Sequence, residues 1–132
     1  MLKKIEYLLP AAMAAVPAKL ERNGSVAAGY QSAISAFGVS IMQMGLLPTF
    51  AVYMDQDSDA DIDREKLLAA LRHILMSPES RYSRKAQLAQ LPDLFQEALA
   101  LSKNANGLRE LQDHTLHAAV ALKLAIRTFK LD

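Results

Sequence analysis

The segment from Phe37 to Tyr53 constrains the fold more than any other part of the chain. It continues a stripe of apolar residues at helical spacing, formed by Ile34, Phe37, Ile41 and Met44. Gly45 interrupts this stripe, and a new apolar run begins with Pro48 in its first turn, where a helix tolerates a missing N–H. The segment contains no nucleophile, metal ligand or phosphate-binding loop. We therefore expect a packed corner between two helices, with an architectural role.

Periodicity along the rest of the chain predicts an all-α protein, a compact single-domain bundle of about six helices spanning 1–132. Short connections at glycine, proline and asparagine separate the helical patterns, and no alternating strand pattern is present. Asp63 is placed to cap a helix that begins at Arg64. A close approach between helices would explain Gly38 inside a helix. The expected helices span 2–22 (kinked or split at its prolines), 27–44, 48–54, 64–76, 79–90, 91–103 and 108–131.

Composition narrows the class of protein. The chain has no Cys, which excludes disulfides, thiolate catalysis and cysteine-based zinc sites. Its net charge of +1 argues against coating nucleic acid by bulk charge, although six of the fourteen acids fall within 55–65 and leave the remainder basic. The apolar run near the N-terminus is interrupted by Glu6 and Pro10, which favours a first helix over a secretion signal. The absence of Cys fits a reducing cytoplasm, where we expect the protein to work. No stretch approaches the roughly 20 apolar residues that a membrane span requires.

An acidic segment at 55–63 imitates the start of a calcium loop, because every second residue is Asp. The position that needs glycine for a sharp turn holds Ala60, and the position that needs a bidentate Glu holds Lys66. The favoured interpretation is a solvated acidic loop, and a cation-binding loop is the alternative.

His114 and His117 are the residues closest to a metal-site pattern, since they lie one turn apart on a helix, with Glu110 one turn before them. A zinc or di-iron site would need further ligands from a second helix, and neither His73 nor Glu97 is fixed opposite the pair by sequence. We therefore predict no catalytic residue, no metal site and no cofactor, and keep a metal enzyme as an alternative.

Basic residues form three groups that could hold a phosphate backbone. Lys123, Arg127 and Lys130 are spaced to lie along one side of the last helix. A second cluster lies near Tyr82, and a smaller third group consists of Lys19 and Arg22. The second cluster is formed by Arg81, Arg84 and Lys85. Ordinary solvated helix faces are the alternative reading of all three groups.

The residues from Ser35 to Tyr53, with their Phe-Gly start and Gly-Leu-Leu-Pro-Thr-Phe-Ala-Val-Tyr corner, resemble the signature of a known family. That family is the small helical subunit of the type III-B CRISPR effector assemblies, the Cmr complexes. The opening Lys-Lys-Ile-Glu-Tyr-Leu-Leu-Pro and the run from Ala118 to Phe129 resemble its first and last helices. The likeness is specific in the corner and loose between Asp55 and Gly107.

The resemblance implies a compact, non-enzymatic helical bundle that works in antiviral defence. It implies that copies of the subunit stack in a filament along the guide–target RNA duplex, beside a larger backbone subunit. There they contact phosphates and stabilise the target RNA. Such stacking needs two different protein surfaces, and Met42 and Met44 could serve one of them. Lys123, Arg127 and Lys130 become the first candidates for contact with the RNA backbone, followed by Arg81, Arg84 and Lys85. A helical adaptor without a nucleic-acid role, responsive to cations through 55–63, remains the alternative.

Overall fold

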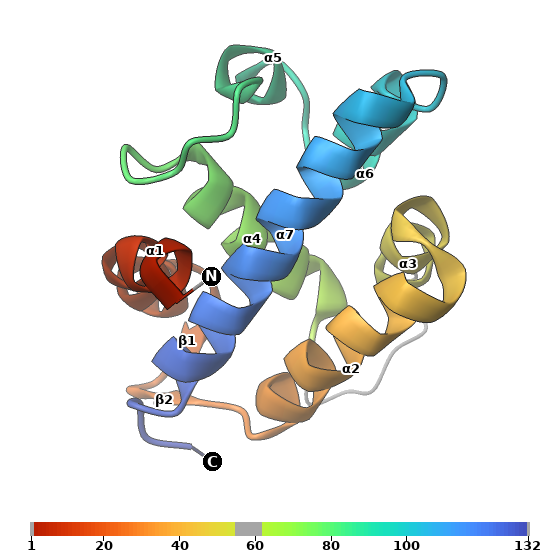
Figure 1. The fold of residues 1–132 in the computed structure, drawn as a ribbon. Helices are drawn as coiled ribbons and strands as arrows, with labels where there is room; N and C mark the ends of the chain where they lie inside the picture. Colours follow the sequence, from red (N-terminus) through yellow and green to blue (C-terminus); the bar gives the residue numbers. More distant parts are fainter. Residues whose placement is uncertain (1, 55–61, 132) are drawn as a thin grey trace.

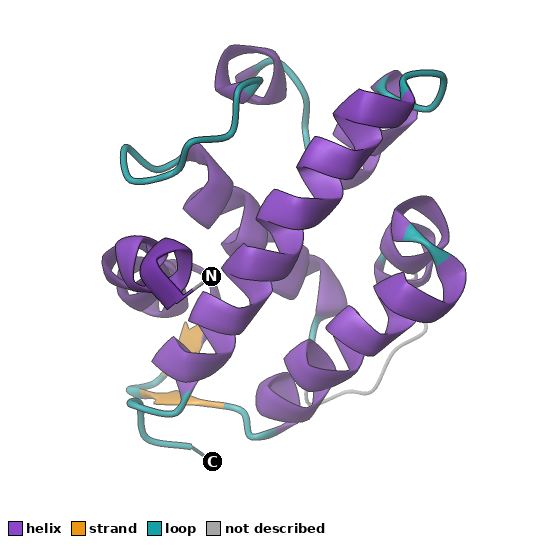
Figure 2. Cartoon of the chain, in the orientation of Figure 1, coloured by secondary structure: helices purple, strands orange, loops and turns teal. Residues whose placement is uncertain are grey.

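The structure, a computed structural model, describes residues 2–54 and 62–131, and this part of the chain is almost entirely helical (Figure 2). The predicted all-α class is confirmed, with seven α-helices and one two-stranded hairpin in the described residues. The elements are α1 (Leu2–Ala15), a π-helical turn η1 (Val16–Leu20), β1 (Glu21–Arg22), β2 (Ser25–Val26), α2 (Gly29–Met44), α3 (Leu46–Tyr53), α4 (Arg64–Met76), α5 (Lys85–Ala89), α6 (Leu94–Ala100) and α7 (Ala105–Ile126).

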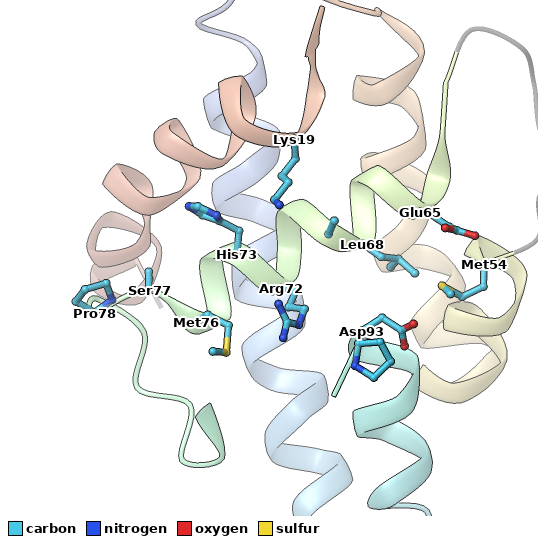
Figure 3. A pocket seen from close by; sticks show the side chains of 12 residues that line it. Lys19, Met54, Glu65, Leu68, Arg72, His73, Met76, Ser77, Pro78 and Asp93 are labelled. Carbon is cyan, nitrogen blue, oxygen red and sulfur yellow. The ribbon is translucent and has the colours of Figure 1, made fainter. Parts of the chain in front are cut away.

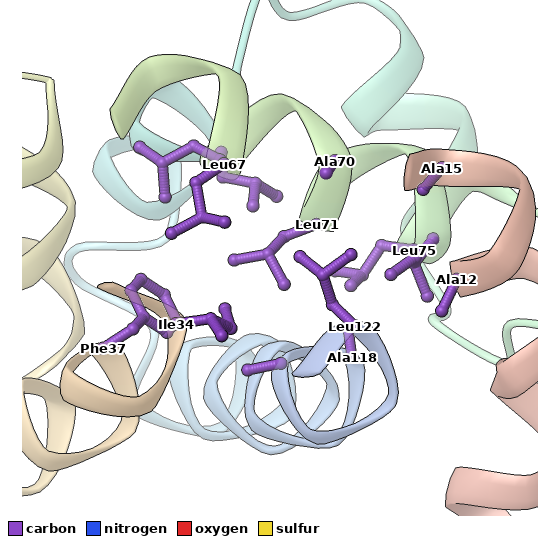
Figure 4. Close-up of a cluster of buried hydrophobic side chains, with 14 of the residues drawn as sticks. Ala12, Ala15, Ile34, Phe37, Leu67, Ala70, Leu71, Leu75, Ala118 and Leu122 are labelled. Carbon is purple, nitrogen blue, oxygen red and sulfur yellow. The ribbon is translucent and has the colours of Figure 1, made fainter. Parts of the chain in front are cut away.

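The long helix α7 forms the centre of the bundle, with α1, α2 and α4 packed around it (Figure 1). Leu71 of α4 and Leu122 of α7 point into the shared core, where Ile34 and Phe37 of α2 reach them (Figure 4). Where α1 packs against the bundle, small buried side chains accompany the larger Leu8 of α1. The small residues are Ala11, Ala12 and Ala15 on α1 and Ala118, Ala121 and Ala125 on α7. These small side chains let the axes of α1 and α7 approach closely.

The expected corner between α2 and α3 is present. Gly45 joins the helices with φ 93° and ψ 170°, a conformation that only glycine adopts readily. The ring of Phe37 packs edge-on against Tyr53 at 5.2 Å between centroids, and the Tyr53 hydroxyl donates to the carbonyl of Ala33 at 2.8 Å. Met44, placed on the apolar stripe by its spacing, is instead 46% exposed, because the stripe turns away from the core as α2 ends.

The N-terminal region differs from the single kinked helix predicted for 2–22. The α-helix ends at Ala15, η1 follows with Pro17 near its start, and the chain then enters the hairpin. Asn23 and Gly24 connect the strands with φ of 54° and 84°, the left-handed pair that a tight hairpin turn needs. The expectation of no strand was therefore wrong, and Asn-Gly was the signal that should have indicated the hairpin.

The last helix is shorter than the predicted 108–131. It begins at Ala105, where the Asn104 side chain accepts from the N–H of Gly107 at 2.9 Å, so the expected turn at 104–107 is a helix cap and first turn. It ends at Ile126, because the chain beyond it runs beside β2. There Lys130 accepts a backbone hydrogen bond from Val26 at 2.8 Å.

Capping side chains fix two other helix starts. The Asp63 carboxylate accepts from the N–H of Glu65 at 2.9 Å, which confirms the predicted cap of α4. Asp93 accepts from the N–H of Gln96, so α6 begins at Leu94 and not at 91. The helix predicted for 79–90 is wrong over its first half, because only Lys85–Ala89 is helical.

The close helix approach predicted at Gly38 is weaker than expected. A Cβ at Gly38 would lie 3.9 Å from Leu116, an ordinary contact, whereas a Cβ at Gly29 would lie 2.7 Å from Cγ2 of Ile62. Of these two glycines, Gly29, the first residue of α2, is therefore the one with too little room for a side chain.

Candidate nucleic-acid and protein interface

The first basic group lies where α7 ends, but only part of it is on the helix. Lys123 occupies the last turn, Arg127 caps the end and is exposed, and Lys130 follows in the extended segment beside β2. The prediction that all three share one side of a helix is wrong for Lys130. The hairpin formed by β1 and β2 brings exposed Arg22 to the same end of the molecule, near the C-terminus (Figure 1). We call Arg22, Lys123, Arg127 and Lys130 the C-terminal basic end.

The second basic cluster is divided by intrachain bonds. Arg84 donates from Nε and Nη2 to the two carboxylate oxygens of Glu97, at 3.0 and 3.1 Å. Lys85 donates from Nζ to the carbonyls of Ser77 and Ser80, at 3.0 and 2.6 Å. These two cations therefore hold the 77–84 loop in place. Arg81, exposed on the same loop, is the member of the cluster that faces solvent most fully.

The partner of Arg84 is a fully buried carboxylate. Glu97 has no exposed surface and also accepts a hydrogen bond from the Tyr82 hydroxyl at 2.6 Å. Burial of the phenol, together with this bond, raises the pKa of Tyr82 far above its usual value. The bond to Glu97 also raises the pKa of Arg84, so the guanidinium stays charged. This network joins the 77–84 loop to α6, and its chemistry is structural because every charge in it is paired.

The exposed large apolar side chains are spread over the bundle, and three of them lie on α2. Met42, Val39 and Met44 are 74%, 56% and 46% exposed, as expected for Met42 and Met44 if they form a contact surface. Val39 and Met42 are three residues apart and share one side of the helix, and we call these two residues the α2 apolar face. Met44, two residues after Met42, lies on another side at the end of the helix. A groove of about 330 Å³ lies between α2 and α7, with Gly38 and Leu116 in its lining and Lys123 among its polar residues. The α2 apolar face could accept an apolar partner surface, whereas the groove borders Lys123 of the C-terminal basic end.

A larger groove of about 560 Å³ lies along α4, where Lys19 of η1 and Arg72 line one part and Glu65 and Asp93 another (Figure 3). Arg72 donates from one nitrogen to the carbonyls of Leu88 and Leu91, both at 3.0 Å. This side chain therefore ties α4 to the segment between α5 and α6. Because its lining contains both basic and acidic residues, the groove offers no uniformly positive surface to a phosphate backbone.

The residues of the candidate metal site are used by other contacts. Glu110 accepts from the backbone N–H and hydroxyl of Ser83 at 3.0 and 2.7 Å, and its Oε2 lies 4.0 Å from Nε2 of His114. Glu97 belongs to the buried network above, so it does not face the histidines as a further ligand. Within 2–54 and 62–131, no group of three or more His, Asp and Glu residues could hold a metal ion.

The calcium-like pattern falls mainly on residues 55–61, which lie outside the described part of the chain. Its last member, Asp63, caps α4, and its backbone N–H donates to the Tyr30 hydroxyl at 3.0 Å. Among the described helices, none is both long and apolar enough to cross a membrane.

These features define a class of protein: a small helical bundle with a basic end and an apolar face, in whose described residues no metal-binding group is present. The chain matches the family of CRISPR-associated protein (Cas_Cmr5) over residues 9–128 and belongs to that family. It is a small subunit of the Cmr complex of type III-B CRISPR systems, as its resemblance implied, and family membership implies association with other Cmr subunits. No curated protein and no solved structure shows significant similarity to the chain.

Sequence reasoning identified the cations but not their partners. It missed that Glu97 neutralises Arg84, since thirteen residues of loop and helix separate the two. It also placed Arg22 in a separate group, because the pairing of β2 with Leu131 has no local signature. The Asn-Gly turn was the available clue to the hairpin that brings Arg22 to the C-terminal basic end.

Proposed function

We propose that this subunit is non-catalytic and stacks along the guide–target RNA duplex of its Cmr complex, stabilising the target RNA through contacts with the phosphate backbone. It does so in the cytoplasm, as part of antiviral defence. The observation that carries the proposal is the C-terminal basic end, in a chain that belongs to the Cmr small-subunit family. Arg127 and Lys130 are exposed there, and no ion pair in the described residues involves either side chain.

Backbone contact suits this surface better than base readout. In an RNA-guided complex, base pairing reads the sequence, so a supporting subunit needs only cations that neutralise phosphates. The C-terminal basic end offers such cations without a recognition helix. Arg81 is the second candidate. Arg84 and Lys85 are also proposed contacts, although the intrachain bonds described above already engage their charged groups.

The proposal is tested with the double variant Lys123→Glu/Arg127→Glu and an RNA duplex of mixed sequence. We expect binding by the full chain to weaken by about tenfold or more, equally for unrelated sequences, with a smaller dependence on salt. The matched control is Lys103→Glu/Arg109→Glu, which makes the same charge change at two exposed residues around the start of α7. Equal effects of the two double variants would show that net charge, not this surface, governs binding.

The protein partners follow from the α2 apolar face. In the proposed filament, this face contacts either a neighbouring copy of the subunit or the larger backbone subunit, and guide and target RNA lie on the basic side. A helical adaptor without an RNA role is the competing function, favoured by the same apolar face. The adaptor reading is supported if the charge reversal leaves RNA binding unchanged while assembly with other Cmr subunits still occurs.

A further inference from the structure

Tyr7 and Arg81 form an aromatic–cation pair between two exposed residues. The guanidinium of Arg81 lies 5.1 Å from the centroid of the Tyr7 ring, and Tyr7 still keeps 56% of its surface exposed. The pair joins α1 to the 77–84 loop, which Arg84 and Lys85 fix from the other side.

The other tyrosines show how unusual this placement is. Tyr30, Tyr53 and Tyr82 are each at most 5% exposed, and the hydroxyl of each makes a hydrogen bond. Tyr7 is the tyrosine that turns its ring to solvent. The Arg81 guanidinium lies over the Tyr7 ring, and an exposed pair of a guanidinium and a phenol presents weakly hydrated planar groups of the kind on which nucleobases stack.

We propose that Tyr7 and Arg81 form a stacking site for an unpaired base of single-stranded RNA, with Arg81 also available to the adjoining phosphate. This inference rests on the proposed RNA contact and adds a second mode to it, because a stacked base is held without regard to its sequence. The site lies on α1 and the 77–84 loop, apart from the C-terminal basic end. A single strand leaving the duplex is the chemistry that it fits.

The chain contains no tryptophan, so Tyr7→Trp places a single fluorescent reporter in the site while keeping an aromatic plane. With the full chain, we expect oligoadenylate to quench the emission of the introduced indole and an abasic strand with the same number of phosphates to leave it unchanged. Tyr7→Ala should weaken oligoadenylate binding by about tenfold, and Tyr7→Leu, an apolar side chain without a ring, should weaken it as much. Arg81→Lys should lose part of the affinity, because it keeps the charge but not the plane.

Each other result is equally informative. Binding of oligoadenylate without quenching, or equal affinity for the abasic strand, rejects stacking but leaves backbone contact intact. Binding of neither strand rejects the stacking site, whereas the proposed function is rejected only if the full chain also fails to bind the mixed-sequence duplex. If Tyr7→Ala leaves RNA affinity unchanged but prevents assembly with other Cmr subunits, the pair is a protein contact and the proposal is wrong.

Discussion

At the scale of single residues, Tyr82 has the most heavily perturbed environment in the described chain. Its ring is 2% exposed, and its hydroxyl donates to the carboxylate of Glu97, which in turn pairs with Arg84. Ionising this phenol would place a second negative charge beside a buried carboxylate. The fold therefore keeps Tyr82 protonated, and the stability of the fold becomes linked to pH in the alkaline range.

The sign of that linkage can be predicted. The folded-state pKa of Tyr82 lies above the unfolded value of 10.0, so its contribution is fully present below pH 10 and is lost as pH rises further. We expect Tyr82→Phe to lower the free energy of unfolding at pH 7 by about 1.5–3 kcal/mol, through the lost bond to a charged acceptor. Above pH 10 the difference should shrink by roughly 1.4 kcal/mol per pH unit. Urea unfolding of both proteins from pH 7 to 11 measures this, and a constant difference would contradict it.

Two glycines of α2 give a second prediction, because the space around them differs. Alanine at Gly29 would meet Cγ2 of the stiff side chain of Ile62 at 2.7 Å, whereas alanine at Gly38 would meet Leu116 at 3.9 Å. We expect Gly29→Ala to destabilise the fold by about 1–3 kcal/mol, as overpacking does. Gly38→Ala should stabilise it by about 0.5–1 kcal/mol through helix propensity. Thermal unfolding of the two variants distinguishes them. If Gly29→Ala also stabilised the fold, the packing around Gly29 would have to relax easily.

At the scale of the elements, local signals decided what could be predicted from the sequence. Asp63, as a helix cap, indicated the start of α4, and the spacing of apolar residues indicated the buried faces of α2, α4 and α7. The 77–84 loop could not be predicted, because it is held by Arg84 on Glu97 and by Lys85 on two carbonyls, contacts between distant parts of the chain. The same contacts hold Arg84 and Lys85 in intrachain bonds that their spacing did not predict, and the contact of this cluster with RNA stays a prediction.

The corner between α2 and α3 allows the third prediction. Gly45 has room for a side chain, since an added Cβ would lie 3.8 Å from Pro48, yet its φ of 93° is unfavourable for any L-residue. Gly45→Ala should therefore destabilise the fold by about 1–3 kcal/mol through backbone strain alone. The control is Gly38→Ala on the same helix, for which the opposite sign is expected. A Gly45→Ala protein with unchanged stability would mean that the corner adopts another conformation without loss.

At the scale of the whole molecule, two kinds of surface lie on different parts of the same bundle. The C-terminal basic end gathers the hairpin and the end of α7, and the α2 apolar face occupies the second half of α2. A subunit that repeats along a filament must contact protein and RNA at once, and it can do so only if these surfaces do not overlap. The central position of α7 fixes both surfaces on one rigid unit, because α1, α2 and α4 all pack against it.

That separation leads to the last prediction. Met42 is 74% exposed, so Met42→Glu should leave the unfolding transition unchanged while placing a charge on the proposed protein contact. We expect it to weaken association with the other Cmr subunits by about tenfold, since a central apolar side chain carries much of the energy of an interface. The matched control is Gln43→Glu, which adds the same charge at the neighbouring exposed position. Co-purification with a tagged backbone subunit compares the two, and RNA binding by each free chain should be the same. If both variants assemble equally well, the contact lies elsewhere, and the exposure of the α2 apolar face has another cause.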